Sequence, residues 1–392
     1  MKKILIFSLA YYPNNVSGAE GAIKEITDRI DSSDIEFHMV TLLSDKSLPK
    51  NEKIGNVNIH RVGFGSVYLS KILFPALAAL KAKKLHKQYK FDAIWAMMTY
   101  MLWPVVLLHF WGVSIPHILT LQDGDPYEKV FERWFIRPFT PLLDYGFRKA
   151  SVIQVISSYL GEWPARRGYK GDIVKIFNGA NPKNMNPDYL QEEVEEIKKQ
   201  LGKNPGDIYL MNAARLVYQK GHDDVIRALL LLPDNVHFVL IGGGPDEKML
   251  KDLVEEKKLG NRVKFIGKLD REDVPKYRNT TIADIFVGPS RSEGLGNSFL
   301  SAMAARLPVI STREGGIAEF LFDKKHNPDK EPTGWVVDKD NSEQIAEAVK
   351  DVLANPGKTK EIVERARDMV FVKFNWDVIA KEMREKVFGR FI

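Results

Sequence analysis

Residues 283–312 read ADIFVGPSRSEGLGNSFLSAMAARLPVIST, and this stretch decides the fold. Its apolar run ADIFVG ends in a glycine-containing loop, a helical segment follows, and a second apolar run, LPVIST, closes it. Two short strands separated by a helix form a βαβ unit, which belongs in a parallel sheet. The runs IYLMNAA, VHFVLIG and RVKFIG show the same alternation, so residues 205–371 are expected to form one doubly wound domain.

The first half of the chain alternates in the same way. Short apolar runs such as KILIFSL, IEFHMVTL, FDAIWA, HILTLQ and SVIQVI alternate with helical or loop segments, which predicts a second Rossmann-like domain over residues 1–183. A polar, proline-containing stretch separates the two, so residues 184–204 are expected to be a linker. The last helix, within residues 372–392, has no strand after it and is expected to pack back on the first domain.

Two apolar stretches require a check against membrane and export signals. Ile4–Ala10 follows a charged start, as in a signal peptide, but the run is short and soon reaches Pro13, so we expect a first strand. Residues 93–122 contain no Asp, Glu, Lys or Arg and are long enough to span a bilayer. Pro104 and Gly112 interrupt them, however, and a buried strand (91–96), helix (99–111) and strand (117–121) explain the composition better.

Composition excludes several kinds of site. The 392 residues contain no cysteine, which excludes disulfides, a thiolate nucleophile and Cys-ligated metals, and which fits a cytoplasmic protein. The net charge of +6 is concentrated between residues 51 and 92, where eight basic side chains face two acidic ones. Most follow the apolar segment LSKILFPALAAL, namely Lys81, Lys83, Lys84, Lys87 and Lys90.

This basic segment has two interpretations. A basic amphipathic helix suits an anionic membrane surface, on the inner face of a membrane for a cytoplasmic protein. A solvated helix face would have the same composition. Nucleic acid is not expected as a partner, because no aromatic side chains that could stack on bases are interleaved among these lysines.

Candidate binding residues follow the strands of the second half, where ligands bind in open α/β sheets. Glu293 lies at a strand-to-helix turn and could accept hydrogen bonds from sugar hydroxyls, and Asn297 could cap a helix whose N-terminus would receive an anion. Arg215 and Lys220 bracket the loop after IYLMNAA and could converge on one diphosphate. An ordinary turn with surface charges is the alternative. The glycine-rich loop IGGGPDEK lacks GxGxxG spacing, so it indicates tight packing.

Taken together, these segments resemble the retaining glycosyltransferases of the family 4 type, whose motifs occur in the same order along the chain. That family has the GT-B fold, in which two Rossmann-like domains face a central cleft. The resemblance covers nearly the whole chain. Its motifs are Ser17–Glu20, Phe177–Gly179, Arg215–Gly221, Val263–Gly267, Pro289–Gly294, Leu307–Ile310, Gly315–Glu319 and Thr333–Val337.

The resemblance implies transfer of a sugar from a nucleotide diphosphate sugar, a UDP- or GDP-sugar, to a glycan or lipid-linked acceptor. The first domain would bind the acceptor and the second the donor, with no metal and no other cofactor. Arg215 and Lys220 would hold the diphosphate, and Glu293 would meet the donor sugar. The remaining donor-binding positions would be Gly18, Gly267, Leu269, Gly294, Leu295, Gly296 and Asn297.

Three positions depart from the family pattern. Ser301 stands where the family carries a second Glu that binds the ribose. Gln122-Asp123 replaces His-Asp, which leaves Gln122 as a hydrogen-bond donor and Asp123 as an acceptor-facing, catalytic candidate. Ser17 replaces the first glycine of a Gly-Gly pair. Asp123 and Asp125 could share a divalent cation, an alternative that their place in the first domain disfavours.

Two other functions remain open. A sugar-nucleotide epimerase with the same fold would consume the donor without an acceptor. A non-catalytic nucleotide-sugar-binding protein would keep the fold and lose turnover. The only residue that suggests this hypothesis is Ser301, which stands in place of the family Glu.

Overall fold

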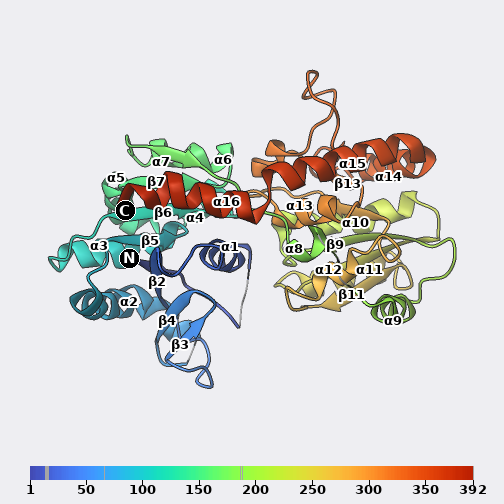
Figure 1. The fold of residues 1–392 in the computed structure, drawn as a ribbon. Helices are drawn as coiled ribbons and strands as arrows, with labels where there is room; N and C mark the ends of the chain where they lie inside the picture. The colour runs from blue at the N-terminus through green and yellow to red at the C-terminus, as the bar shows by residue number, and fades with distance from the viewer. Residues whose placement is uncertain (14–16, 66, 186, 188, 392) are drawn as a thin grey trace. The chain divides into compact units, whose positions relative to one another are not determined.

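The computed structural model describes residues 1–13, 17–65, 67–185, 187 and 189–391, and the chain forms two compact units (Figure 1). The first unit comprises Met1–Asn178 and Trp376–Ile392, and the second comprises Gly179–Asn375. Each is built on its own sheet, which confirms two doubly wound α/β domains. The stretch 184–204, expected to be a linker, instead belongs to the second unit.

The sheet of the first unit has eight strands in the order β3-β4-β2-β1-β5-β6-β7-β8. All neighbours pair in parallel except β3 and β4, which form an antiparallel hairpin at one edge. The strands are β1 (Lys2–Phe7), β2 (Ile35–Leu42), β3 (Asn51–Ile54), β4 (Val57–Val62), β5 (Ala93–Met97), β6 (His117–Leu121), β7 (Val152–Val155) and β8 (Ile173–Lys175). The order reverses between β1 and β5, which is the switch point of this sheet.

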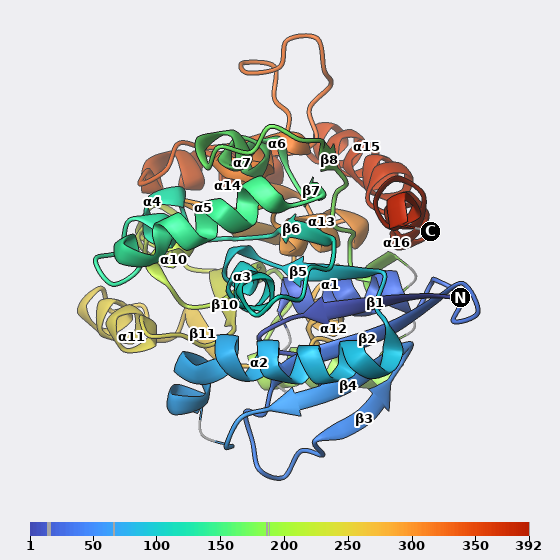
Figure 2. The same ribbon diagram turned by 90° about the vertical axis from the view of Figure 1, so that its left-hand side faces the viewer.

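Helices cover both faces of this sheet (Figure 2). On one face, α2 packs against α3 and α3 against α5; on the other, α1 packs against α16. These helices are α1 (Gly18–Thr27), α2 (Val67–Tyr89), α3 (Leu102–Phe110), α5 (Thr140–Lys149) and α16 (Trp376–Glu382). The smaller ones are α4 (Tyr127–Phe131), α6 (Ser158–Gly161) and α7 (Trp163–Arg166), with the short helices η1 (Thr99–Met101), η2 (Arg137–Phe139), η6 (Met383–Val387) and η7 (Phe388–Phe391).

The chain's last segment completes the core of the first unit. The Phe388 ring meets Phe37 of β2 at 5.8 Å and Trp95 of β5 at 5.1 Å, both edge-on. All three side chains are buried, so this segment shields apolar surface of the sheet from water. The expected helix from 372 begins only at Trp376, because α15 (Pro356–Lys373) runs on through residue 372.

The two apolar stretches that were checked against membrane and export signals both belong to this unit and form strands and a helix. Ile4–Phe7 is buried within β1 at the centre of the sheet, which confirms the predicted first strand. Residues 93–121 form β5, α3 and β6, as predicted, and both strands are buried along their whole length. Within the described ranges, no helix has the length and apolar content needed to cross a membrane.

The sheet of the second unit has six parallel strands in the order β11-β10-β9-β12-β13-β14. The strands are β9 (Ile208–Ala213), β10 (Val236–Ile241), β11 (Val263–Gly267), β12 (Ile285–Gly288), β13 (Val309–Ser311) and β14 (Trp335–Val336). The chain starts in the middle with β9 and the order reverses between β9 and β12. This arrangement has the Rossmann order and predicts ligand binding in the loops after those two strands.

The helices of the second unit are α8 (Pro182–Met185), α9 (Gln191–Leu201), α10 (His222–Ala228), α11 (Glu247–Glu256), α12 (Val274–Tyr277), α13 (Asn297–Ala304), α14 (Ser342–Ala354) and α15, with the short helices η3 (Tyr218–Lys220), η4 (Leu229–Leu231) and η5 (Gly315–Glu319). The buried core lies between the sheet and helices α10, α11 and α14. Helix α13 packs against α15 and α8.

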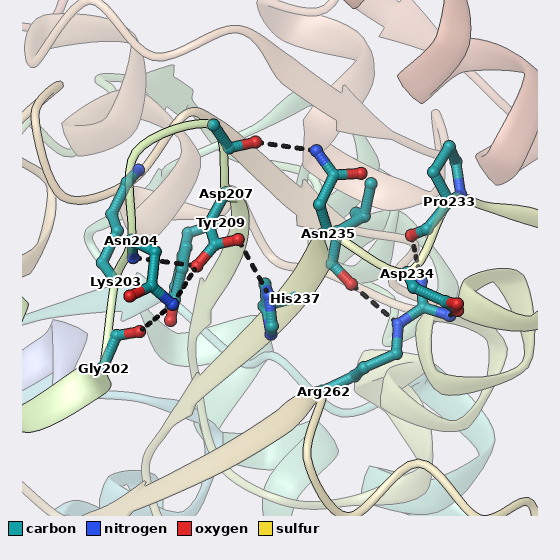
Figure 3. A network of polar contacts seen from close by, with 12 residues as sticks. Gly202, Lys203, Asn204, Asp207, Tyr209, Pro233, Asp234, Asn235, His237 and Arg262 are labelled. Carbon is teal, nitrogen blue, oxygen red and sulfur yellow. Dashed lines mark hydrogen bonds and ion pairs between the residues drawn. The ribbon is translucent and has the colours of Figure 1, made fainter.

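The amino edge of this sheet carries a dense polar network (Figure 3). Lys203 Nζ contacts Asp284 Oδ2 at 2.6 Å, and the same carboxylate accepts the Tyr209 amide at 2.8 Å. Arg262 donates to the carbonyls of Val236 at 2.9 Å and of Pro233 at 2.8 Å. Lys203 and Arg262 therefore pair with carboxylate and carbonyl groups at the amino ends of the strands.

Candidate active site

The switch point of the second sheet brings together two predicted site residues. Lys220 ends η3 in the loop after β9, and Glu293 lies in the loop after β12. The Lys220 ammonium contacts Glu293 Oε1 in a short ion pair. Their side chains are only 14% and 12% exposed, so the contact is partly screened from water. Residues 73 positions apart in the chain thus form one charged pair at the carboxyl edge.

Arg215 lies in the same loop and is exposed. Its backbone carbonyl accepts a hydrogen bond from Nε2 of the buried His222 at 3.2 Å, which ties the loop to the start of α10. Burial lowers the pKa of His222 to about 4, so this imidazole is neutral at pH 7. In the described parts of the chain, no carboxylate pairs with the Arg215 guanidinium, which leaves all of its donors available to a ligand.

Arg291 organises this site, a role that was not predicted from the sequence. Its side chain, 8% exposed, contacts Asp223 at 2.9 Å, Asp224 at 2.6 Å and Asp340 at 2.5 Å. It also donates to the Tyr218 carbonyl at 2.7 Å, and so clamps the loop after β12 to the loop that carries Lys220. Burial and the neighbouring Asp223 raise the pKa of Asp224 to about 6, although Arg291 opposes the shift. The acidic pair after Gly221 was the available signal.

Glycines allow the two loops to approach closely. A Cβ on Gly221 would lie 2.3 Å from the Pro289 carbonyl, and its φ of +65° is left-handed. A Cβ on Gly315 would lie 2.0 Å from the Glu293 carbonyl, and the Gly316 amide donates to that carbonyl at 2.9 Å. The backbone of Glu293 is therefore held from behind by the Gly315-Gly316 turn.

Helix α13 begins four residues after Glu293. Gly296, with φ +99°, is its N-cap, and Asn297 is its first residue, so the prediction that Asn297 caps the helix was wrong. A left-handed N-cap favours glycine because a Cβ there would be strained. Gly294 and Leu295 are buried under this turn, and Gly296 and Asn297 are half-buried beside the helix N-terminus. With eight residues, α13 directs amides and a partial positive charge toward this edge.

A buried arginine lies beneath that helix start. Arg278 donates to Ser298 Oγ at 2.8 Å and to Asn184 Oδ1 at 3.1 Å, and burial lowers its pKa to about 10. Ser298 in turn donates to the Ala213 carbonyl at the end of β9, at 2.8 Å. This chain of hydrogen bonds fixes α13 relative to the Arg215 loop. Arg278 was not predicted, because its partners are distant in the sequence.

The glycine-rich loop after β10 and the remaining predicted donor positions, Gly267 and Leu269, lie at the same edge of the sheet. In the IGGGPDEK loop, a Cβ on Gly242 would lie 2.0 Å from the Ala214 carbonyl and one on Gly244 would lie 2.1 Å from the Leu216 carbonyl, so these glycines serve tight packing, as predicted. Gly267 ends β11 with φ +81°, and a side chain there would meet no atom within 4 Å. Leu269 follows it, half-buried.

In the first unit, Asp123 follows β6 and is buried. Its Oδ2 accepts from the Thr99 hydroxyl at 3.0 Å and from the Thr99 amide at 3.4 Å. Burial is the main cause that raises its pKa to about 6. Gln122 beside it accepts a hydrogen bond from Asn178 Nδ2 at 2.7 Å, which joins the strand end to the Phe177–Gly179 motif.

Two further predicted features of this unit have different surroundings. Gly18 is exposed as the first residue of α1, next to Ser17, whose amide and hydroxyl donate to Glu20. Asp125 pairs with Lys129 at 3.0 Å, whereas Asp123 contacts Thr99, so the two carboxylates have separate partners. Over residues 1–13, 17–65, 67–185, 187 and 189–391, no group of three or more His, Asp or Glu side chains is arranged to hold a metal.

Two family models match this chain. Residues 193–369 match the family described as glycosyl transferases group 1, and residues 16–184 match glycosyltransferase family 4. This chain belongs to the family 4 glycosyltransferases. The matched regions cover both units and include every predicted site residue, and the family assignment confirms the resemblance drawn from the sequence motifs.

Individual relatives of this glycosyltransferase extend over most of its length. An uncharacterized glycosyltransferase of Methanocaldococcus jannaschii is 29% identical over 402 residues, 97% of this chain and 96% of that protein. A GDP-mannose-dependent α-(1-6)-phosphatidylinositol monomannoside mannosyltransferase of Mycobacterium tuberculosis is 28% identical over 249 residues, 61% of this chain and 62% of that protein. The sucrose-phosphate synthase structure from Thermosynechococcus elongatus has a TM-score of 0.85 and 20% identity, with 100% of this chain and 99% of that one covered. The fold is therefore GT-B.

Within this glycosyltransferase, Ser301 is engaged by the protein itself. Its hydroxyl donates to the Asn297 carbonyl at 2.8 Å and accepts from the Asn181 amide at 3.0 Å. Asn181 also donates from Nδ2 to the Arg271 carbonyl at 3.3 Å. Ser301 thus fastens the start of the second unit to helix α13, a role that the comparison with the family Glu did not suggest.

Proposed function

We propose that this enzyme is a retaining glycosyltransferase that moves a hexosyl group from a nucleotide diphosphate sugar to an acceptor. The observation that carries the proposal is the Lys220–Glu293 pair at the β9/β12 switch point, with Arg215 open to solvent in the same loop. An anion-binding cation and a hydroxyl-binding carboxylate are the two groups that the diphosphate and the sugar of such a donor require.

Donor binding would exchange the partners of this pair. Lys220 and Arg215 would contact the diphosphate, beside the amides of Gly294–Asn297 at the start of α13. Glu293 would then accept hydrogen bonds from the sugar hydroxyls, and the base would lie near Gly267 and Leu269. Because negative charge grows on the diphosphate as the glycosidic bond breaks, fixed cations and helix amides stabilise the transition state more than the ground state. These groups supply the charge that a metal supplies elsewhere, so we propose metal-independent transfer.

The acceptor side of the proposal rests on Asp123 in the first unit. A carboxyl group with a pKa of about 6 can exchange a proton near neutral pH, and a buried one is well suited to fix an acceptor hydroxyl. Gln122 would donate a second hydrogen bond, and Gly18 would let the first unit's loop approach the diphosphate. The matched mycobacterial enzyme acts, by its name, on a phosphatidylinositol monomannoside, which favours a lipid-linked acceptor here.

A lipid-linked acceptor would bring the enzyme to the inner face of a membrane. Of the five lysines predicted to contact it, Lys84, Lys87 and Lys90 are exposed on or just after α2. Lys81 is half-buried, and Lys83 donates to the Trp111 carbonyl at 3.1 Å. Three exposed lysines, at about 1 kcal/mol each near an anionic surface, would give weak, salt-sensitive binding.

Donor identity and reaction type can be tested together. A thermal-shift screen against UDP, GDP, ADP and CDP should show stabilisation by one base, because a ligand that binds only the folded state raises its apparent stability. The matching labelled sugar nucleotide is then incubated with candidate lipid-linked glycans, and the anomeric configuration of the product is read by NMR. Retained configuration supports the proposal, and an inverted product contradicts it.

The same incubation separates the two rival functions. An epimerase would convert the labelled donor to its epimer with no acceptor present. A binding protein would be stabilised by the nucleotide and would neither transfer nor slowly hydrolyse the sugar. Activity that survives chelation with EDTA supports metal independence, and loss that Mg²⁺ restores contradicts it.

A further inference from the structure

A short loop of the first unit presents an unusual group of aromatic side chains. Between α4 and α5, Trp134 is 83% exposed, Phe135 is 47% exposed and Phe139 is 44% exposed. The Trp134 and Phe135 rings contact each other edge-on at 5.6 Å. Single exposed apolar residues are normal on a protein surface, whereas a contiguous aromatic group indicates an interaction site.

The loop has a defined shape. Ile136, at its centre, is buried, and the Arg137 amide donates to the Arg133 carbonyl at 2.9 Å. The Phe139 ring rests against Trp103 of α3 at 5.3 Å. Buried Ile136 therefore anchors the turn, while the Trp134 and Phe135 side chains remain exposed.

The position of the loop connects it to α2. Because the strands are parallel, the helices between them run in the opposite direction, and the N-termini of α2, α3 and α5 lie at the carboxyl end of the sheet. The aromatic loop directly precedes α5, and the first half of α2 exposes Leu69 (52%) and Ile72 (61%). Figure 2 shows α2, α3 and α5 on the same side of the sheet. The carboxyl edge, where Asp123 lies, therefore has an apolar rim.

We propose that the loop Arg133–Phe139 inserts its aromatic side chains into the interfacial region of an anionic bilayer. Trp is enriched at that depth because its ring is apolar while its N–H can still reach water. Arg137 is exposed within the aromatic group and matches the charge of anionic headgroups, whereas Arg133 is half-buried and pairs with Asp125 at 3.8 Å. A symmetric contact with a second copy would bring Arg137 toward its own counterpart, which disfavours self-association. The loop and α2 together would hold Asp123 near a lipid-linked acceptor, and to that extent the inference rests on the proposed function.

Vesicle binding tests the loop without any glycosyl transfer. The protein is co-sedimented at low salt with vesicles of phosphatidylcholine and phosphatidylglycerol, and the double variant Trp134→Ser/Phe135→Ser should bind about tenfold or more weakly, given the apolar area lost. The matched control is Val378→Ser, which removes a 45% exposed apolar side chain from α16, on the opposite face of the same sheet. Arg215→Ala should bind vesicles like the wild type, so a failed transfer assay and a failed docking site give different results.

Fluorescence provides a second readout. Anionic vesicles should shift the wild-type emission to the blue, acyl-chain bromination should quench it, and both effects should shrink in Trp134→Phe, which retains an aromatic ring. Equal binding by the double variant and the wild type, or no binding at all, overturns the proposal. Analytical ultracentrifugation showing self-association that the double variant abolishes also overturns it, in favour of a second copy of the chain.

Discussion

Asp123 and Glu293 occupy equivalent places in the two units, yet their surroundings differ. Each carboxylate lies in a loop after a strand, at the carboxyl edge of a parallel sheet. Glu293 contacts the Lys220 ammonium, and Arg215 lies in the same loop as that lysine. Asp123 is buried against Thr99, and among the described residues no cation contributes to the shift of its pKa. At the predicted site residues, the second unit thus has fixed charge, whereas the first has a carboxyl group whose proton changes near neutral pH.

Under the proposed function, this difference corresponds to a division of work between the units. Fixed cations stabilise charge that develops on a leaving group, and they do so best when hydrogen bonds hold their loops in place, as Arg291 does here. A carboxyl group with a raised pKa is instead suited to contact a hydroxyl and exchange a proton. Four substitutions test this division, beginning with the largest expected effect.

Arg215→Ala should lower kcat by ~10²-fold or more, because a cation that acts on the leaving group contributes mainly in the transition state. Donor affinity should fall much less. Arg215 is exposed, so the variant should fold normally, which a thermal melt checks. Lys248→Ala is the control, since its side chain is 86% exposed on α11 and removes the same charge elsewhere in this unit. Turnover close to that of the wild type would remove Arg215 from the site.

Asp123→Asn should change how stability depends on pH. The folded protein holds the Asp123 proton up to about pH 6, whereas an unfolded Asp loses it near pH 4. The free energy of unfolding that Asp123 contributes should therefore fall as pH rises through this window, by roughly 3 kcal/mol. Urea unfolding at pH 4 and pH 7.5 should show that the Asp123→Asn variant gains stability relative to the wild type at the higher pH.

The same substitution at Asp125 controls for the loss of a carboxylate from this loop, because Asp125 pairs with Lys129 near the surface. A difference between Asp123→Asn and the wild type that stays constant from pH 4 to pH 7.5 would contradict the contrast between the two carboxylates.

Gly315→Ala should destabilise the second unit by about 1–3 kcal/mol and lower turnover, because overpacking forces the backbone to move. Its φ is +60°, and the added Cβ would lie 2.0 Å from the Glu293 carbonyl. Gly260→Ala is the matched control, since a Cβ there meets no atom within 4 Å. If the two variants unfold at the same urea concentration, the turn does not hold Glu293 as described.

The sequence predicted the features that depend on local patterns of apolar residues, namely the strands and the residues at their ends. Buried strands appear as apolar runs, and their alternation with helices is enough to place Arg215, Lys220 and Glu293 at strand ends. It did not pair Arg291 with the acidic residues after Gly221, because Asp223 and Asp224 lie 68 and 67 positions away and no local pattern joins them to Arg291. The prediction for Asn297 follows from the general preference of Asn for helix caps, but Gly296 takes the left-handed conformation one residue earlier.

At Ser301 the family comparison did not reveal a contact that the structure shows. A serine in place of the expected Glu suggests a weakened ribose contact and nothing more. The bond from the Asn181 amide to Ser301 Oγ joins residues 120 positions apart, and no local pattern records it. The side chain therefore has a structural partner whether or not a ribose approaches it.

Ser301→Glu should produce the smallest effect, since two consequences oppose each other. A carboxylate would offer charge-assisted hydrogen bonds to two ribose hydroxyls if the nucleotide binds as in the family, which lowers its dissociation constant. The larger side chain must also leave the position where Ser301 accepts the Asn181 amide, which costs on the order of 1 kcal/mol of stability. We expect a dissociation constant lowered by less than about tenfold, together with a lower melting temperature.

Ser301→Ala separates the two effects, because it loses the Asn181 hydrogen bond and adds no acid. It should melt earlier than the wild type and bind the nucleotide equally well by calorimetry. Weaker nucleotide binding in Ser301→Ala would mean that the ribose depends on the Asn181–Ser301 contact, and weaker binding in Ser301→Glu alone would mean that the pocket no longer accepts the family's acid.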